Sequence, residues 1–239
     1  RRDTSHPIQK IGCRPVFNTH RSSISCFALV KTSEGPHAVV TGCVDGALHV
    51  WPYGPFPVQG KEMKLPNLEA LRIVPNAHQN GVSAIEGLYN AVATGGYDQC
   101  IKLWSLPSGQ CVQQLKMEAS VVSALSSSRL SLINTGPLDG RVDEDICVEG
   151  LLAGSGEGMV FIWSLTNMQL LGVIAGPESR VLSIAASPEQ KALTLGYLDG
   201  SVTLHRVEAP NFPEIGRHRV KGAAIDCSWF QDTGPKSIR

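Results

Sequence analysis

Apolar and polar residues alternate over short runs along much of the chain, and polar turns separate the runs. The clearest stretch contains four such runs, at residues 82–85, 91–94, 100–104 and 111–115. Alternation with a period of two is typical of a β-strand with one buried face. We therefore expect an antiparallel four-stranded meander here. Because no stretch shows sustained helical spacing, we predict an all-β chain.

One arrangement of residues is repeated at the end of the third run of each unit. An acidic residue stands six positions before an aromatic ring. The pairs are Asp45 with Trp51, Asp98 with Trp104, Glu157 with Trp163, and Asp199 with His205. A repeated unit of this size cannot bury its apolar face alone, so the copies are expected to stack on one another.

The second copy has a histidine before the first strand, a threonine before the turn, an aspartate in the turn and a tryptophan ending the third strand, and the first copy has the same set. In these residues the chain resembles the WD40-repeat β-propeller family, in which each repeat forms one blade. The resemblance implies a structural hydrogen-bond network in each of the two blades. Its members are His20, Thr41, Asp45 and Trp51 in the first, and His78, Thr94, Asp98 and Trp104 in the second. Such bonds would offset the cost of burying an aspartate.

The third and fourth copies depart from this pattern. Ala153 and Glu157 replace the threonine and the aspartate in the third copy, and Leu195 and His205 replace the threonine and the tryptophan in the fourth. We expect complete hydrogen-bond networks in the first two blades only. The other two blades are expected to rely on apolar packing against their neighbours.

The spacing between copies predicts how the chain divides into blades. The aromatic positions are separated by 53, 59 and 42 residues, whereas the family's unit has about 40–45 residues. The longer spacings predict insertions at 52–76 and 129–145. We predict one WD40-type β-propeller domain over residues 1–239, with about four complete blades and a partial blade at each end. The blades are expected at 18–76, 77–117, 118–176 and 177–222, and the partial blades at 1–17 and 223–239.

Propellers close into rings of about 4–8 blades, because an open ring leaves sheet edges exposed. We expect the chain to form part of a seven-bladed ring in a longer protein. In the alternative, the two terminal parts of the chain build one composite blade and close a five-bladed ring.

Composition argues against several classes of function. Lysine plus arginine and aspartate plus glutamate number 21 each, which disfavours broad electrostatic binding of nucleic acid. No apolar run reaches the roughly 18 residues of a membrane span. Seven cysteines without a CxxC pair indicate a reduced, intracellular and cytoplasmic protein. The seven histidines are scattered, so the sequence predicts neither a metal site nor a cofactor.

No motif predicts catalysis. The glycine-rich string at 154–158 lacks the Lys-Ser/Thr ending of a phosphate loop and aligns with the strand and turn of a blade. We therefore expect a protein that is not an enzyme. The resemblance implies a protein–protein interaction scaffold, within a larger protein or a multisubunit complex, whose partners are other proteins or peptides.

The resemblance also implies where partners bind: at the turn before each third strand and at the loop before each first strand. Interface hot spots are rich in aromatic and arginine side chains. The candidates at these positions are Arg21, Val44, Gln79, Tyr97, Arg180 and Leu198. The insertion at 52–76, in which Tyr53 and Phe56 lie among prolines, is a second candidate.

Two alternative functions stay open. A substrate-recognition subunit of a ubiquitin ligase would resemble WD40 proteins whose repeats end in Trp-Asp-x-Arg. However, Trp51, Trp104 and Trp163 are followed by proline, serine and serine. An RNA- or ribosome-associated propeller would bind RNA in a salt-dependent way, which the balanced charge disfavours.

Overall fold

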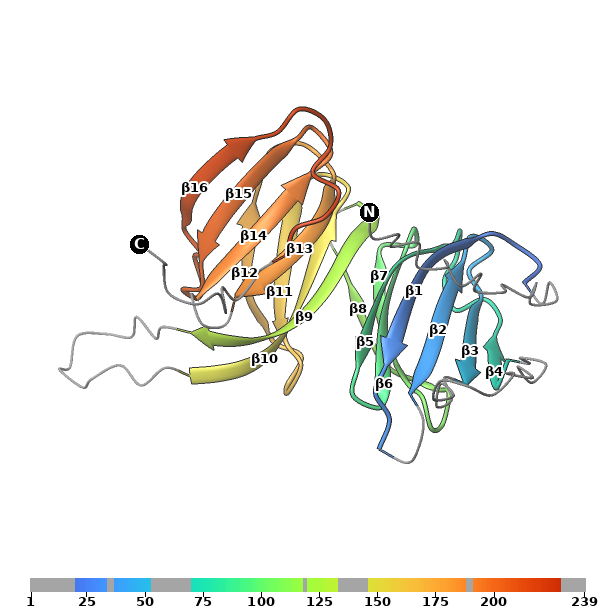
Figure 1. Ribbon diagram of the computed structural model, residues 1–239. Helices are drawn as coiled ribbons and strands as arrows, with labels where there is room; N and C mark the ends of the chain where they lie inside the picture. Colours follow the sequence, from blue (N-terminus) through green and yellow to red (C-terminus); the bar gives the residue numbers. More distant parts are fainter. Residues whose placement is uncertain are drawn as a thin grey trace, which may run out of the picture.

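The computed structural model describes residues 20–33, 37–52, 70–117, 120–132, 146–187 and 191–228. Over these ranges the chain forms four antiparallel sheets of four strands each, and no helix. The sheets follow one another in an arc in the order of the sequence (Figure 1). The prediction of an all-β chain built from four-stranded meanders is confirmed.

Each sheet is one blade, made of four strands that are consecutive in the sequence, and each lies within one of the residue ranges predicted for a blade. Blade 1 contains β1 (Ile24–Val30), β2 (Ala38–Cys43), β3 (Leu48–Pro52) and β4 (Arg72–Val74). Blade 2 contains β5 (Val82–Leu88), β6 (Ala91–Gly96), β7 (Cys100–Ser105) and β8 (Cys111–Lys116). Blade 3 contains β9 (Val122–Leu132), β10 (Ile146–Ser155), β11 (Met159–Ser164) and β12 (Leu170–Ala175). Blade 4 contains β13 (Val181–Ser187), β14 (Ala192–Tyr197), β15 (Ser201–Arg206) and β16 (Glu214–Arg219).

Parts of both predicted insertions belong to sheets. Strand β4 lies inside the segment 52–76, and β9 continues into the segment 129–145 as far as Leu132. Leu130 and Leu132 are buried, so the alternation of the strand continues beyond the predicted boundary. The β9–β10 hairpin consequently extends beyond the rest of its blade (Figure 1). The predicted partial blade at 1–17 lies outside the described residues.

Neighbouring blades share apolar interfaces. The third strand of each blade has an aromatic residue near its end. In each interface, the face of the blade that carries this residue packs on the preceding blade. Trp104 packs with Val40 and Leu48 of blade 1, and Trp163 packs with Ile101 and Leu103 of blade 2. The interface between blades 3 and 4 includes Leu152, Ile162, Leu193, Leu195 and Tyr197. Burial of each large apolar side chain contributes about 1.5–3 kcal/mol, which favours stacked blades over separate ones.

In blades 1 to 3, a serine near the start of the first strand, which we call the inner strand, joins its own blade to the next one. Each hydroxyl lies within hydrogen-bond distance of two backbone carbonyls, one in its own second strand and one in the inner strand of the next blade, and it can donate its single proton to either. Ser25 lies 3.0 Å from Gly42 O and 2.6 Å from Val82 O, Ser83 lies 3.1 Å from Gly95 O and 2.5 Å from Val122 O, and Ser123 lies 3.2 Å from Gly154 O and 2.7 Å from Val181 O. Each of these sets consists of a serine, the glycine of its own second strand and the valine of the next inner strand. We call each set a seam.

The glycine of each seam allows the next blade to approach closely. A Cβ atom at Gly42, Gly95 or Gly154 would overlap Cγ1 of the valine that follows it around the arc. These valines, Val82, Val122 and Val181, are fully buried. Any larger residue in place of the glycine would push two blades apart at the inner strands.

The chain after blade 4 makes a related contact from a different strand position, because Ser183 pairs with Gly196 as Cys26 pairs with Gly42 in blade 1. Ser183 Oγ donates to Ala224 O at 3.3 Å, and a Cβ atom at Gly196 would lie against that carbonyl. Ala224 thus contacts blade 4 through its carbonyl, whereas the seam valines contact the glycine through their side chains. Residues 223–228 form no strand, so a further blade beginning at 223 stays a prediction.

The face of blade 1 that points away from blade 2, which we call its outward face, exposes apolar side chains. Ile24 occupies the position of the seam valines, but it is 51% exposed, whereas the valines are completely buried. Phe27 and Leu29, on the same strand, are 73% and 50% exposed. Closure of a seven-bladed ring over this face stays a prediction.

Gly95→Ala should lower the free energy of unfolding by about 1–3 kcal/mol, because the added methyl group overlaps Val122. The double variant Gly95→Ala, Val122→Ala should lose less than the sum of the two single variants in urea unfolding. Gly216→Ala is the control, since the nearest atom to its Cβ would be 3.8 Å away. Strictly additive losses would contradict the contact.

Candidate protein-interaction surface

Blade 2 contains a continuous hydrogen-bond chain from its third strand to its turn. Trp104 Nε1 donates to Thr94 Oγ1 at 2.8 Å, and Thr94 Oγ1 lies 2.7 Å from His78 Nε2. His78 Nδ1 lies 2.8 Å from Asp98 Oδ1, and because a carboxylate only accepts, Nδ1 carries the proton. Burial lowers the pKa of His78, which favours the neutral ring, so Nε2 accepts from the threonine hydroxyl.

Asp98 ties the loop before β5 to the turn after β6. It accepts hydrogen bonds from the backbone N–H groups of Gln79 and Cys100, both at 3.2 Å, and lies 3.6 Å from Lys102 Nζ. Burial acts to raise the pKa of Asp98, but the hydrogen bond and charge of His78 and the two N–H bonds outweigh it and lower the pKa. The carboxylate is therefore stabilised in its charged form.

Blade 1 contains a different chain from the one expected. Trp51 Nε1 donates to Thr41 Oγ1 at 3.0 Å, and Thr41 lies 3.5 Å from His20 Nε2. His20 Nδ1 then faces Cys43 Sγ at 3.2 Å rather than Asp45. Asp45 lies in the exposed turn, where it accepts the N–H of Ala47 at 3.1 Å. The predicted His20–Asp45 bond is thus replaced by a thiol contact, because the buried cysteine stands between the ring and the turn.

Blade 3 lacks a comparable chain among its described residues, as its sequence leads one to expect. Glu157 is exposed, and the hydroxyl of Ser155 accepts the turn's N–H groups instead. Trp163 stacks on Phe161 with ring centroids 5.6 Å apart, inside the apolar interface with blade 2.

Blade 4 contains a polar chain that the sequence pattern did not predict. His205 Nδ1 donates to Phe212 O at 3.0 Å, and His205 Nε2 lies 3.0 Å from Thr203 Oγ1. Thr203 in turn shares a hydrogen bond of 3.4 Å with the Tyr197 hydroxyl. Blade 4 therefore combines the expected apolar packing against blade 3 with an internal polar network that was not expected. His205 occupies the position of the family's tryptophan, but its partners Thr203, Tyr197 and Phe212 O lie outside the pattern, so the pattern could not reveal the network.

The turn after each second strand is anchored in the same way in all four blades. Its first N–H donates to a carbonyl in the loop before the inner strand: Val44 to Ser23 at 2.9 Å, Tyr97 to Gly81 at 3.2 Å, Gly156 to Val121 at 3.0 Å and Leu198 to Arg180 at 2.9 Å. The side chains of Val44, Tyr97 and Leu198 are 51%, 47% and 55% exposed. These bonds fix the backbone of the turns. Three apolar side chains project from the same turn position in three blades.

The other candidates lie in the loops to which these turns are bonded. Arg21 and Gln79 are exposed, and Arg180 is half-buried, with its Nε buried and without a hydrogen-bond partner. The structure therefore places all six sequence-predicted candidates on the same rim of the arc, which we call the turn rim. The second candidate, with Tyr53 and Phe56, lies outside the described residues.

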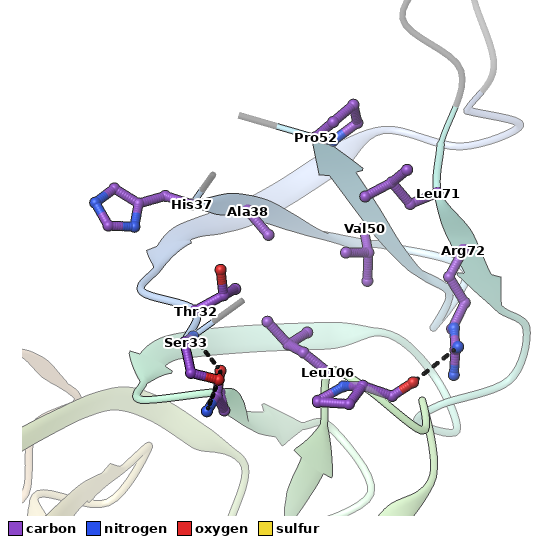
Figure 2. Close-up of a pocket in the computed structure, with 11 residues that line it drawn as sticks. Thr32, Ser33, His37, Ala38, Val50, Pro52, Leu71, Arg72 and Leu106 are labelled. Carbon is purple, nitrogen blue, oxygen red and sulfur yellow. Dashed lines mark hydrogen bonds between the residues drawn. The ribbon is translucent and has the colours of Figure 1, made fainter. Parts of the chain in front are cut away.

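A cavity on the opposite rim was not predicted from the sequence. It has a volume of about 350 Å³ and lies between blades 1 and 2 (Figure 2). Val50, Leu71 and Leu106 line it, and two sets of polar contacts join its own walls: Ser33 with Asn90, and Arg72 Nη2 with Pro107 O at 3.2 Å. Its walls come from several separate loops, so no local motif could indicate it.

The inner strands of the four blades surround a wider space of about 660 Å³. Ser25, Ser83, Ser123 and Ser183 line this space, but the first three hydroxyl groups donate to backbone carbonyls of the seams and that of Ser183 donates to Ala224 O. These serines are therefore used in holding the blades together.

Comparison with known proteins agrees with this architecture. Two segments, 11–52 and 70–105, match the family described as WD domain, G-beta repeat. A CCR4-associated factor 4 homolog of Candida glabrata is 28% identical over 46% of this chain and 19% of its own length. Mitochondrial division protein 1 of Eremothecium gossypii is 25% identical over 69% of this chain and 22% of its own length. The chain thus spans about a fifth of these curated relatives.

Solved structures show the same fold. The computationally designed Ika8 protein superposes with a TM-score of 0.62 at 21% identity, covering 89% of this chain and 54% of the designed chain. A chain of the Mitotic Checkpoint Complex gives a TM-score of 0.63 at 13% identity, covering 87% of this chain and 56% of that one. The chain thus has the fold of a WD40-type β-propeller, and its segments 11–52 and 70–105 match the WD40 repeat.

Asp98→Ala should lower the free energy of unfolding by about 1–3 kcal/mol, because it leaves the buried His78 and the backbone N–H groups of Gln79 and Cys100 without their acceptor. Glu157→Ala should cost less, since that side chain is exposed. Urea unfolding of the two variants measures the difference. Equal losses would contradict the role given to Asp98.

Proposed function

We propose that the chain is a non-catalytic protein-interaction scaffold that binds partner proteins or peptides on the turn rim. The observation that carries this proposal is the exposure of Val44, Tyr97 and Leu198 at one equivalent turn position in three blades. An exposed apolar side chain on a fixed backbone loses little conformational freedom on binding, so more of its burial contributes to affinity.

The chemistry of the rim favours a partner with apolar side chains and a polar or acidic border. Val44 and Tyr97 flank Gly81, since a Cβ atom there would contact both Val44 O and the Tyr97 ring. Arg21, Gln79 and Arg180 lie in the adjoining loops and supply donors around the apolar positions. Apolar anchors with an arginine-containing polar rim are characteristic of protein interfaces.

The comparisons with known proteins support the assignment as a non-catalytic protein-interaction scaffold. WD40 propellers are generally non-catalytic, and the matching relatives are named as an associated factor and a division protein rather than as enzymes. No helix in the described part of the chain is long and apolar enough to cross a bilayer. None of the cysteines within the described ranges forms a disulfide.

Tyr97→Ser and Leu198→Ser together should remove partners from affinity capture of the full-length protein, because both changes delete apolar anchors without touching a blade interface. Tyr89→Ser is the matched control. Tyr89 is 68% exposed, but it lies in the β5–β6 hairpin on the opposite rim. Quantitative mass spectrometry compares the proteins captured by the parent protein, by the double variant and by Tyr89→Ser.

Partners lost from the double variant and kept by Tyr89→Ser would support the turn rim as the binding surface. An unchanged partner list in the double variant would contradict it. Thermal unfolding of each variant should accompany the capture, so that a misfolded variant is recognised.

A further inference from the structure

The outward face of blade 1 brings together three side chains with metal-binding donors. The pairing of Thr41 with His49 places His49 on the same face as Thr41 and, two residues further along β2, Cys43. His20 reaches this face from the loop before β1. One donor atom of each of His20, Cys43 and His49 lies within 4.8 Å of those of the other two.

The distances are close to those that a zinc ion requires. Zinc–nitrogen and zinc–sulfur bonds of about 2.0 and 2.3 Å place the ligands of a tetrahedral ion about 3.5 Å apart. His20 Nδ1 and Cys43 Sγ are 3.2 Å apart, and the rings of His20 and His49 have centroids separated by 4.2 Å. The three donor atoms lie within 4.8 Å of one another, so they would have to move closer together to hold one ion.

A second observation is independent of this clustering. His49 is only 5% exposed, and its Nδ1 is buried without any hydrogen-bond partner. A buried polar atom left unpaired is unfavourable, and native structures rarely contain one without a reason. A cation would use the lone pair that the protein leaves unused.

The surroundings also suit a cation. His20 Nε2 lies 3.5 Å from Thr41 Oγ1, so the nitrogen opposite the thiol has the outer hydrogen bond that fixes a metal-binding histidine. Asp45, in the adjacent turn, interacts electrostatically with all three residues, and its charge would balance that of a zinc–thiolate unit. In blade 2 the corresponding histidine is bonded to Asp98, so the thiol contact distinguishes blade 1.

We propose that His20, Cys43 and His49 bind a zinc ion, with the fourth position taken by Asp45 or water. Two imidazoles and a thiolate form a ligand set that suits zinc. Burial keeps the two rings neutral by lowering the pKa of His20 and of His49. Burial, with the charge of Asp45, raises the pKa of Cys43 to about 11, so the ion must displace the thiol proton, which leaves to solvent as the zinc–sulfur bond forms.

The sequence alone predicted no metal site, because the three ligands are separated by 23 and 6 residues and match no spacing motif. Pairing within the β2–β3 hairpin brings Cys43 and His49 together, and the loop before β1 adds His20.

Cobalt(II) reports such a site by colour, since a thiolate bound to tetrahedral cobalt gives a charge-transfer band. The reduced, chelator-treated chain should develop this band at one equivalent of cobalt, and one equivalent of zinc should remove it. Cys43→Ser should abolish the band, and His49→Gln should weaken cobalt binding at least about tenfold. The matched controls are Cys111→Ser and His218→Gln, both at exposed positions, which should bind as the parent chain does.

Absence of the band in the parent chain would overturn the proposal whatever the variants do. Persistence of the band in Cys43→Ser would also overturn it, because another thiol would then hold the metal. Tryptophan fluorescence on thermal unfolding establishes that each variant is folded before its titration.

Discussion

The seams between blades are the constraint on which the rest of the structure depends. At each seam a serine hydroxyl bonds to a carbonyl of the next blade, a glycine removes the side chain that would separate the two, and a valine fills the space. These contacts fix the spacing of the inner strands, and the apolar interfaces then pack outward from them. The same spacing places the turns of successive blades along one rim.

Within the blades, polar networks vary while the seams are repeated. Blade 2 links tryptophan, threonine, histidine and aspartate, blade 1 ends at a thiol, blade 4 uses a tyrosine and a backbone carbonyl, and blade 3 relies on stacked aromatic rings. A blade can therefore lose its internal network and still hold its place in the arc. Blade 1 can therefore carry a different set of polar side chains on its outward face, which includes the proposed metal ligands.

Much of the fold could be predicted from the sequence, because strand alternation and the repeated turn acid are local signals. The candidates on the turn rim could be named because the resemblance to WD40 repeats implies which turns and loops bind partners. The serine–glycine–valine seams were missed, since their partners are 39 to 58 residues apart and each residue is unremarkable by itself. Asp45 was assigned to a histidine by analogy with Asp98, although Cys43 occupies that place. The network around His205 depends on a carbonyl, which no sequence pattern displays.

The central claim is that the turn rim presents apolar side chains on a backbone held by bonds between the turns and the loops before the inner strands. Hydrogen exchange of the Tyr97 and Leu198 amides tests it most directly, because both amides donate to such a loop although their side chains are exposed. The account predicts that both amides exchange as slowly as those inside the neighbouring strands. Exchange as fast as in an unprotected turn would contradict a fixed rim.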